Sequence, residues 1–446
     1  MKFSKKSLLS LVVTVFMVLS MLTACGSQAN NTQSTTSKTA PQGKVHLRWL
    51  YFGNPDEQKQ WTATAKAFTD SQDKIEVEYM PCASDAYTQK ILTMFASHES
   101  PDTFYARNGE TPTLLKENKL LDLKPFIDSD PNFKLDDYVN LAQINKPYMV
   151  NGKIFAIHDN DNPMVLYYNK TLITGMGFDD PNAMYQQGKW TWDEWKKIAS
   201  KVRDSSTSAK PMYPFIQDAW SGPNFLWACS NGVDSFYTAD GKPAYNDPRV
   251  IEALKWSVDS FKDKTILYGA STGKGMDSTQ LFQTGQLAFT SAGRWMVPTY
   301  KKITNFKWDI VPFPKGPQAS KYIAYTPGYT AFAISAETKH PKEAWQFLSW
   351  FVGKEGQTQN WSKGGNCLPT IKGLEKTVLD DIAYYEHPQT FLDIQKVSIW
   401  PDIPYAMNPK EVKLVDDAFQ KVFMLQGDPK QTMDQLCSDI SSGATK

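Results

Sequence analysis

The first part of the chain alternates strand patterns with helix patterns, and this order constrains its fold more than any other feature. Val45–Tyr51 and Ile75–Tyr79 read as strands, each is followed by a helix pattern, and Asp102–Tyr105 reads as a third, short strand. A βαβαβ order closes right-handed into a parallel sheet, and ligands bind such sheets beyond the carboxyl ends of the strands. We therefore expect an α/β fold, with binding residues in the loops 52–57 and 105–110.

The N-terminus carries the pattern of a secretory signal peptide. Three lysines precede the apolar run Leu8–Leu22, which is too short for a comfortable membrane span. The run leads into Leu-Thr-Ala-Cys, which resembles the lipobox of bacterial lipoproteins, in which the cysteine is acylated. We expect a lipoprotein signal peptide at 1–24, a lipid on Cys25 and a disordered polar tether over 25–43. A plain signal peptide with an incidental cysteine is the alternative.

Composition and charge exclude several classes of protein. With 41% hydrophobic and 21% charged residues the chain has the balance of a globular protein, and 446 residues leave room for two lobes. The formal net charge of +1 argues against nucleic acid or an anionic membrane as the principal partner. The sequence has no Gly-rich phosphate loop and no nucleophile elbow, so we expect no cofactor.

The cysteines and histidines indicate no metal or redox site. Beyond Cys25 the chain has Cys82, Cys229, Cys367 and Cys437, which form no C-x-x-C pair. Three disulfide pairings are arithmetically possible, but buried free thiols are the plainer expectation. The five histidines are scattered without an H-E-x-x-H motif, so we expect no bound metal.

The stretch 286–370 is the most informative about function. A short apolar strand ends in small residues and is followed directly by Arg294 and Trp295, which places an aromatic ring at the mouth of a turn. Three prolines then stiffen the extended segment 308–317, which we expect to cross between two lobes. A turn containing Tyr329 leads into another strand and a helix.

This order of motifs resembles a known family. The motifs are Gly-x-x-Ala-Phe at 285–289, Gly-Arg-Trp at 293–295, Pro-x-Pro at 312–314, Gly-Tyr at 328–329 and Gly-Asn-Cys-Leu-Pro at 365–369. As a set they resemble the family 1 extracellular solute-binding proteins, the carbohydrate-binding components of ABC importers, a group that includes maltose-binding protein. The likeness extends more loosely over nearly the whole chain after Cys25.

The resemblance implies a two-lobed periplasmic-binding-protein fold of type II, in which each lobe is a mostly parallel sheet flanked by helices and the ligand cleft lies between the lobes. The expected N-terminal lobe comprises 44–158 and 312–357, and the expected C-terminal lobe comprises 159–311 and 358–446. The polar segment after His158 is expected to be the first crossing between them.

A sugar site needs two kinds of group, because aromatic rings cover the C–H faces of a sugar while polar side chains bind its hydroxyls. The chain is 13% aromatic with 14 Trp, too many for all of them to be buried. The candidate platforms are Tyr105, Trp220, Trp227, Trp295 and Tyr329, and the candidate polar partners are Asn54, Glu57, Asn108, Asp159, Asp161 and Arg294. The resemblance supports Trp295 and Tyr329 best.

Several of these candidates also have a plainer structural account. Trp295 could fill the core of a lobe, and Asp159 and Asp161 could cap the turn at the crossing. Arg294 could form a structural ion pair, and Glu57 could interact with a helix dipole. Trp220 and Trp227 lie among turn residues without a helical period, which favours a binding loop. The aromatics of 190–195 surround a predicted capping box that begins at Thr191, which favours core packing. Asn408, followed by Pro409 and the capping-box residue Glu411, predicts another capped helix start.

The resemblance implies a function without covalent chemistry. We expect a monomeric, lipid-anchored receptor on the extracytoplasmic face of the cell membrane, which captures a sugar or oligosaccharide by closure of its lobes and delivers it to an ABC permease. A surface-anchored glycoside hydrolase is one alternative and would need two carboxylates about 5–9.5 Å apart. The same fold binding a non-sugar solute, such as a peptide or polyamine, is the other.

Overall fold

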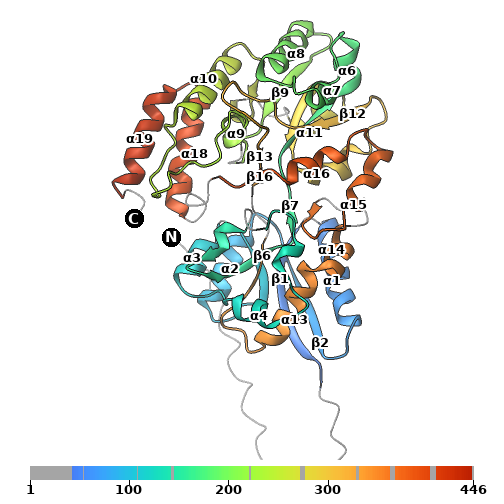
Figure 1. Cartoon of the computed structure of the whole chain (residues 1–446), viewed down its shortest axis with the longest axis vertical. Helices are drawn as coiled ribbons and strands as arrows, with labels where there is room; N and C mark the ends of the chain where they lie inside the picture. The colour runs from blue at the N-terminus through green and yellow to red at the C-terminus, as the bar shows by residue number, and fades with distance from the viewer. Residues whose placement is uncertain are drawn as a thin grey trace, which may run out of the picture. The chain divides into compact units, whose positions relative to one another are not determined.

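Figure 1 shows the computed structural model of the chain. The residues that the structure describes are 43–53, 55–107, 109–141, 145–219, 222–271, 277–327, 331–361, 367–401 and 408–443. The expected signal peptide, Cys25 and the expected tether up to residue 42 lie outside them. The folded unit begins at Lys44, and none of its described helices has the length and apolar character needed to cross a bilayer.

The first sheet contains the predicted βαβαβ start. Its strand order is β2-β1-β3-β14-β6, with bounds Ile75–Cys82, Val45–Phe52, Thr103–Ala106, Ala331–Ile334 and Ala156–His158. Strands β1, β2 and β3 run parallel, and β14 runs antiparallel to both β3 and β6. Helices α1 (Pro55–Asp70) and α2 (Tyr87–Ala96) make the crossovers, so the predicted order is confirmed.

The second sheet forms the centre of the other lobe. Its order is β10-β9-β11-β8-β12, with bounds Leu267–Tyr268, Tyr213–Gln217, Leu287–Ala292, Val165–Asn169 and Trp308–Val311. Strands β8, β11 and β12 are buried along their whole length, as expected for strands covered on both faces. The long helices of this lobe are α8 (Trp192–Ser205), α10 (Pro248–Lys262), α18 (Pro409–Phe423) and α19 (Pro429–Ser441) (Figure 1).

The remaining elements are short, apart from α13 (Pro341–Val352) and α14 (Lys354–Trp361). The short helices are α3 (Thr111–Lys116), α4 (Lys124–Ser129), α6 (Lys170–Gly175), α7 (Pro181–Gln186), α9 (Leu226–Ser230), α11 (Ser278–Gln283), α12 (Val297–Tyr300), α15 (Lys376–Leu379) and α16 (Gln389–Gln395). The 3-10 helices are η1 (Leu135–Asp137), η2 (Lys146–Tyr148), η3 (Gly222–Phe225), η4 (Gly269–Ser271), η5 (Arg294–Met296) and η6 (Asp380–Ala383). The short strands are β4 (Met149–Val150), β5 (Lys153–Ile154), β7 (Asn160–Asp161), β13 (Ala324–Tyr325), β15 (Leu368–Pro369) and β16 (Ser398–Ile399).

Two predicted helix starts have the side-chain caps that their sequences indicate. The Thr191 side chain accepts a hydrogen bond from the Glu194 amide at the start of α8, and Asn408 accepts from two amides at the start of α18. Around the first cap, Trp190, Trp192 and Trp195 are all buried, which confirms the prediction of core packing there.

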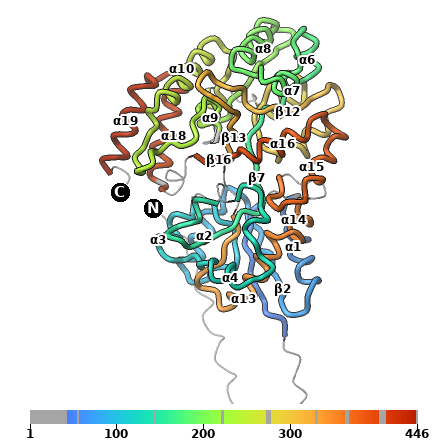
Figure 2. Tube along the Cα trace, in the orientation of Figure 1, coloured from blue at the N-terminus to red at the C-terminus, as the bar shows by residue number. Residues whose placement is uncertain are grey.

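Short strand pairs connect the segments that run between the two sheets. The chain leaves β6 and enters β8 through β7, which pairs with β15. Strand β13 pairs with β16, and Figure 2 shows these two strands beside each other. The expected crossing at 308–317 is wrong. Strand β12 lies within the second sheet, and the Trp190 indole donates to Pro312 O at 2.8 Å while Lys315 N donates to Trp190 O at 3.1 Å. The chain is back in the first sheet at β14, which pairs with β3.

The predicted lobe boundary at 357/358 falls inside α14. The last turn of this helix packs on the first lobe, because Asn360 Oδ1 accepts from Thr64 of α1 at 2.6 Å and Trp361 contacts Trp61. The other boundary residues stay predictions. The four cysteines after Cys25 are buried free thiols, as expected.

Candidate ligand-binding site

Aromatic side chains gather where β1 and β3 end. The Tyr51 ring centroid lies 4.4 Å from that of Tyr105 and 4.5 Å from that of Trp61. Tyr105 is 1% exposed, and its backbone amide and carbonyl both bond the Tyr87 hydroxyl. In this conformation the Tyr105 ring is therefore part of the core of the first lobe, and its role as a platform stays a prediction.

The charges of the 105–110 loop pair with each other. The Arg107 guanidinium lies over Phe52 and Tyr87, 4.6 and 4.8 Å from their ring centroids. Glu110 is fully buried and accepts from the Arg107 amide at 2.8 Å and from Thr88 Oγ1 at 2.9 Å. Burial raises the pKa of Glu110 to about 7, although Arg107 opposes the rise. The predicted ligands Asn54 and Asn108 lie outside the described residues.

Asp161 holds together the segments that run between the sheets. Its carboxylate accepts from Thr326 Oγ1 at 2.7 Å and from Ser398 Oγ at 2.8 Å, so it connects β7 to residues at the ends of β13 and β16. Burial raises its pKa to about 6. Both carboxylate oxygens have protein partners, which agrees with the structural account of this residue.

Asp159 has the opposite environment. It is 0% exposed, and neither carboxylate oxygen has a hydrogen-bond partner among the described residues. Burial raises its pKa to about 7, and the neighbouring Asn160 amide offsets part of the rise without reaching hydrogen-bond geometry. The indole of Trp361 donates to the Asp159 backbone carbonyl at 3.2 Å. A buried carboxylate without a donor calls for an explanation, because burying an unpaired charge is costly.

Arg294 is held by the protein itself. It is 0% exposed, and its guanidinium donates to Asp381 at 2.7 Å, to Cys367 O at 2.8 Å and to Thr377 O at 3.2 Å. The structural ion pair considered from the sequence is therefore present. Whether Arg294 also contacts a ligand stays a prediction.

Trp295 is partly exposed and borders both hydrophobic clusters of the folded unit. Its ring folds back over Gly293, so closely that a Cβ on this glycine would lie 2.1 Å from Cζ3 of the indole. Gly293 therefore allows the orientation of the ring. The partial exposure leaves Trp295 the strongest of the described platform candidates.

We expect Gly293→Ala to displace the Trp295 ring, because the added methyl group would overlap the indole. The indole can rotate away, so the protein should fold while its ligand affinity falls at least tenfold. Isothermal titration with a bound ligand checks the affinity, and circular dichroism checks the fold. Gly175→Ala, at the end of α6, is the control for adding a methyl group, because its Cβ would meet open space and its φ is not positive. Unchanged affinity in Gly293→Ala would contradict this role of the glycine.

Three of the predicted ligand residues carry charges that affect one buried group, the Cys367 thiol. The charges of Asp159 and Glu57 help burial to raise the pKa of the Cys367 thiol, and Arg294 opposes them. Glu57 is half-buried on the first turn of α1. The structure thus brings Glu57, Asp159 and the Arg294–Trp295 turn together around Cys367. The Asn162 amide lies 3.0 Å from the Cys367 sulfur.

The prediction that Trp227 lies on a binding loop is wrong. The residue is part of helix α9, is 2% exposed and donates its indole N–H to Gln217 at 3.1 Å. Its ring contacts Trp195 and Trp256, with centroids 5.2 and 4.5 Å away, so α8, α9 and α10 bury it between them. Helix α9 is too short to show a helical period in the sequence. Trp220 and Tyr329 lie outside the described residues.

Three further residues with buried polar atoms were not singled out as ligands from the sequence. Trp361 and Asp381 support Asp159 and Arg294, but nothing in the sequence around them marks that role. Glu411 was read only as part of a capping box, and one of its oxygens is buried without a partner among the described residues. Burial raises the pKa of Glu411 to about 7.

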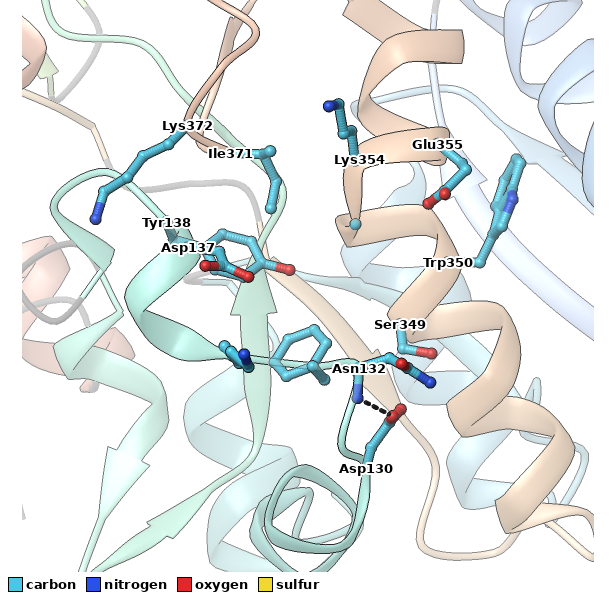
Figure 3. Close-up of a pocket in the computed structure, with 13 residues that line it drawn as sticks. Asp130, Asn132, Asp137, Tyr138, Ser349, Trp350, Lys354, Glu355, Ile371 and Lys372 are labelled. Atoms are coloured by element: carbon cyan, nitrogen blue, oxygen red, sulfur yellow. Dashed lines mark hydrogen bonds between the residues drawn. The ribbon is translucent and has the colours of Figure 1, made fainter.

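Two further features lie apart from this site. A pocket of about 590 Å³ lies on the first lobe between the segment 130–138 and the end of α13, with Tyr138 and Ser349 on opposite sides (Figure 3). In the second lobe, Asp180, Asp309, Glu386 and His387 lie close enough to surround a cation. Their charges already have protein partners, because Lys170 Nζ lies 2.6 Å from both Asp180 and Glu386, and His387 Nδ1 lies 2.6 Å from Asp309.

Comparison with known proteins identifies the family. The family model described as bacterial extracellular solute-binding protein matches residues 63–389. A multiple sugar-binding protein of Streptococcus mutans is 24% identical over 84% of this chain and 85% of its own length. A probable ABC transporter-binding protein of Deinococcus radiodurans is also 24% identical, over 53% of this chain and 56% of its own length.

A solved structure supports the same fold. An ABC substrate-binding protein of Listeria monocytogenes, in complex with cycloalternan, superposes with a TM-score of 0.73 at 18% identity and covers 90% of this chain and 99% of its own. This likeness confirms the two-lobed α/β fold. Because the family model spans well over half of the chain and strands of both sheets, the chain belongs to the bacterial extracellular solute-binding proteins.

Proposed function

We propose that this protein captures a sugar or oligosaccharide outside the cytoplasm and delivers it to an ABC permease. The family match across both lobes carries the proposal, and the multiple sugar-binding protein of Streptococcus mutans supports the ligand class. The proteins compared with it are binding proteins, not enzymes. The site also combines a partly exposed indole, Trp295, with the acceptors Glu57 and Asp159, which suits a polyhydroxylated ligand.

Capture works through lobe closure. A ligand that contacts both lobes favours the closed arrangement by its difference in affinity for the two states. The Asp161 carboxylate accepts hydrogen bonds from Thr326 and Ser398 and so connects the segments between the sheets to one another. We therefore expect these connected segments to bend as one unit when the lobes close.

The proposal includes a lipid anchor. Residues 1–24 act as the signal peptide, acylated Cys25 anchors the protein, and 25–43 tethers a monomeric folded unit on the extracytoplasmic face. Radiolabelled palmitate should label the wild-type protein in cells and not Cys25→Ser. Equal labelling of both would contradict the anchor.

Ligand capture is tested by melting the protein against a panel of neutral mono-, di- and oligosaccharides. A ligand at a hundred times its Kd stabilises the folded state by about 2.7 kcal/mol, which raises the melting temperature measurably. We expect Trp295→Ala to abolish this shift, because the mutation removes the aromatic platform. Trp350→Ala is the matched control, since Trp350 is also partly exposed but lies beside the pocket of Figure 3.

Each outcome of this screen has a clear meaning. A shift that Trp295→Ala loses and Trp350→Ala keeps supports a sugar receptor with Trp295 in its site. Silence across the whole panel would contradict the sugar ligand and favour a non-sugar solute. Release of reducing sugar during the incubation would instead favour the hydrolase.

A further inference from the structure

Asp159 lies where three parts of the candidate site converge. It follows β6 directly and precedes β7 on the segment between the sheets. Besides burial, its charge raises the pKa of Tyr51, at the end of β1, and that of Cys367. The Cys367 carbonyl accepts a hydrogen bond from Arg294, which is next to Trp295. Asp159 is 0% exposed in this conformation, and its oxygens have no partner among the described residues, so a ligand donor that reaches it as the lobes move would find an unsatisfied acceptor.

Two tyrosines and a cysteine near Asp159 are uncharged at neutral pH. Burial raises three pKa values above their usual range, those of Tyr51 in β1, Tyr138 after η1 and Cys367 before β15. The charge of Asp159 adds to each rise. Asp161 is nearby in sequence, but Thr326 and Ser398 bond it. The other charged groups acting on Cys367 are Glu57, an acid, and Arg294. Among the described groups, Asp159 faces no cation that lowers its pKa.

The described guanidinium groups at the site are engaged elsewhere. Arg294 is paired with Asp381 at 2.7 Å, and Arg107 lies over two aromatic rings beside buried Glu110. Among the described residues, an anionic sugar would thus meet the carboxylates of Glu57 and Asp159 and cations that already have acidic partners. A neutral sugar would supply the hydroxyl donors that Asp159 lacks.

We propose that Asp159 is a specificity-determining residue, which accepts hydrogen bonds from ligand hydroxyl groups and makes the site select uncharged saccharides over uronic acids. The inference rests on the proposed function and deepens it. A neutral sugar satisfies the buried acceptor, whereas a uronate would place a second carboxylate near it without a cation between them.

The selectivity should depend on pH in one direction. The pKa of Asp159 is raised to about 7 by burial, so the group is mostly protonated below that pH and ionised above it. A uronate is ionised across the whole range, so its repulsion by Asp159 appears as pH rises through 7. The preference for the neutral sugar should therefore be greater at pH 8 than at pH 5.5.

The test measures Kd by isothermal titration of the full chain in detergent. The probes are matched pairs of a neutral sugar and its uronic acid, in which a carboxylate replaces the C6 hydroxymethyl group on one or both units. Examples are cellobiose with cellobiouronic acid and galactobiose with digalacturonic acid. For the pair that binds, we expect at least a hundredfold preference for the neutral sugar at pH 8 and at least a tenfold smaller preference at pH 5.5. Asp159→Asn should reduce the preference to under tenfold at both pH values.

The control is Asp259→Asn, which removes the same charge from an exposed position on α10 and should keep the wild-type preference. Equal or tighter binding of the uronate by the wild type at pH 8, or an unchanged preference in Asp159→Asn, would overturn the inference alone. If neither sugar of any pair binds, the proposed function fails and the inference with it. If Asp159→Asn does not fold, the inference is tested by how the preference of the wild type for the neutral sugar changes between pH 5.5 and pH 8.

Discussion

Arg294→Met is expected to lower the free energy of unfolding by about 3–5 kcal/mol, the usual cost of breaking a buried ion pair from one side. The guanidinium is 0% exposed and bonds Asp381 and two backbone carbonyls. Its removal leaves Asp381, which is 6% exposed, with the Tyr385 hydroxyl at 3.4 Å as the one remaining partner of its carboxylate among the described residues. Urea unfolding followed by Trp fluorescence measures the change, provided that the slope with denaturant stays constant.

A double mutant separates the ion pair from the packing. Arg294→Met combined with Asp381→Leu removes both charges, so it should recover part of the stability that Arg294→Met loses. Arg203→Met is the control, because that arginine pairs with Asp204 at the surface, where an ion pair contributes about 0–1 kcal/mol. A loss below 1 kcal/mol in Arg294→Met would contradict the structural role of the pair.

Asp159→Asn is expected to stabilise the ligand-free protein at pH 8, even though it weakens ligand selection. A pKa raised from about 3.9 in the unfolded chain to about 7 in the folded one corresponds to a cost of up to about 4 kcal/mol above pH 7. The folded state keeps its stability below pH 4, where the carboxyl is protonated in both states. It loses stability as pH rises through 7.

The measurement is the melting temperature of wild type and Asp159→Asn between pH 4 and pH 8. The two curves should meet near pH 4 and separate as pH rises, with the variant several degrees higher at pH 8. Asp259→Asn, an exposed carboxylate, should follow the wild type throughout. A variant that melts below the wild type at pH 8 would show that Asp159 has a donor in the ligand-free protein.

Such a stabilising mutation is consistent with a functional position. Binding sites often keep buried polar groups that the empty fold does not satisfy, because the ligand satisfies them. Asp161, two residues along, is also buried but has Thr326 and Ser398 as donors. The contrast separates a structural carboxylate from a candidate binding carboxylate within one short segment.

Local patterns in the sequence predicted the elements that depend on neighbouring residues. The βαβαβ start, the cap at Thr191 and the cap at Asn408 follow from periodicity and side-chain chemistry within a few residues, and the structure has all three. The motif set around Trp295 predicted the family, which the family model confirms.

The placement of long-range contacts required the tertiary structure. Trp227 and Trp295 are both tryptophans near turns, but one packs among α8, α9 and α10 while the other stays partly exposed over Gly293. Likewise, proline content predicted a crossing at 308–317, whereas hydrogen bonds to Trp190, more than a hundred residues away, hold this segment in the second lobe.

The sequence by itself determined the α/β class, the family and the short list of ligand candidates, because these depend on patterns of neighbouring residues. Only the tertiary structure decided which candidates have partners: Asp161 and Arg294 are bonded by residues distant in the chain, while the carboxylate of Asp159 is bonded by none of the described ones. Partners of this kind are set by how the lobes fold, and burial then determines the cost of each charge.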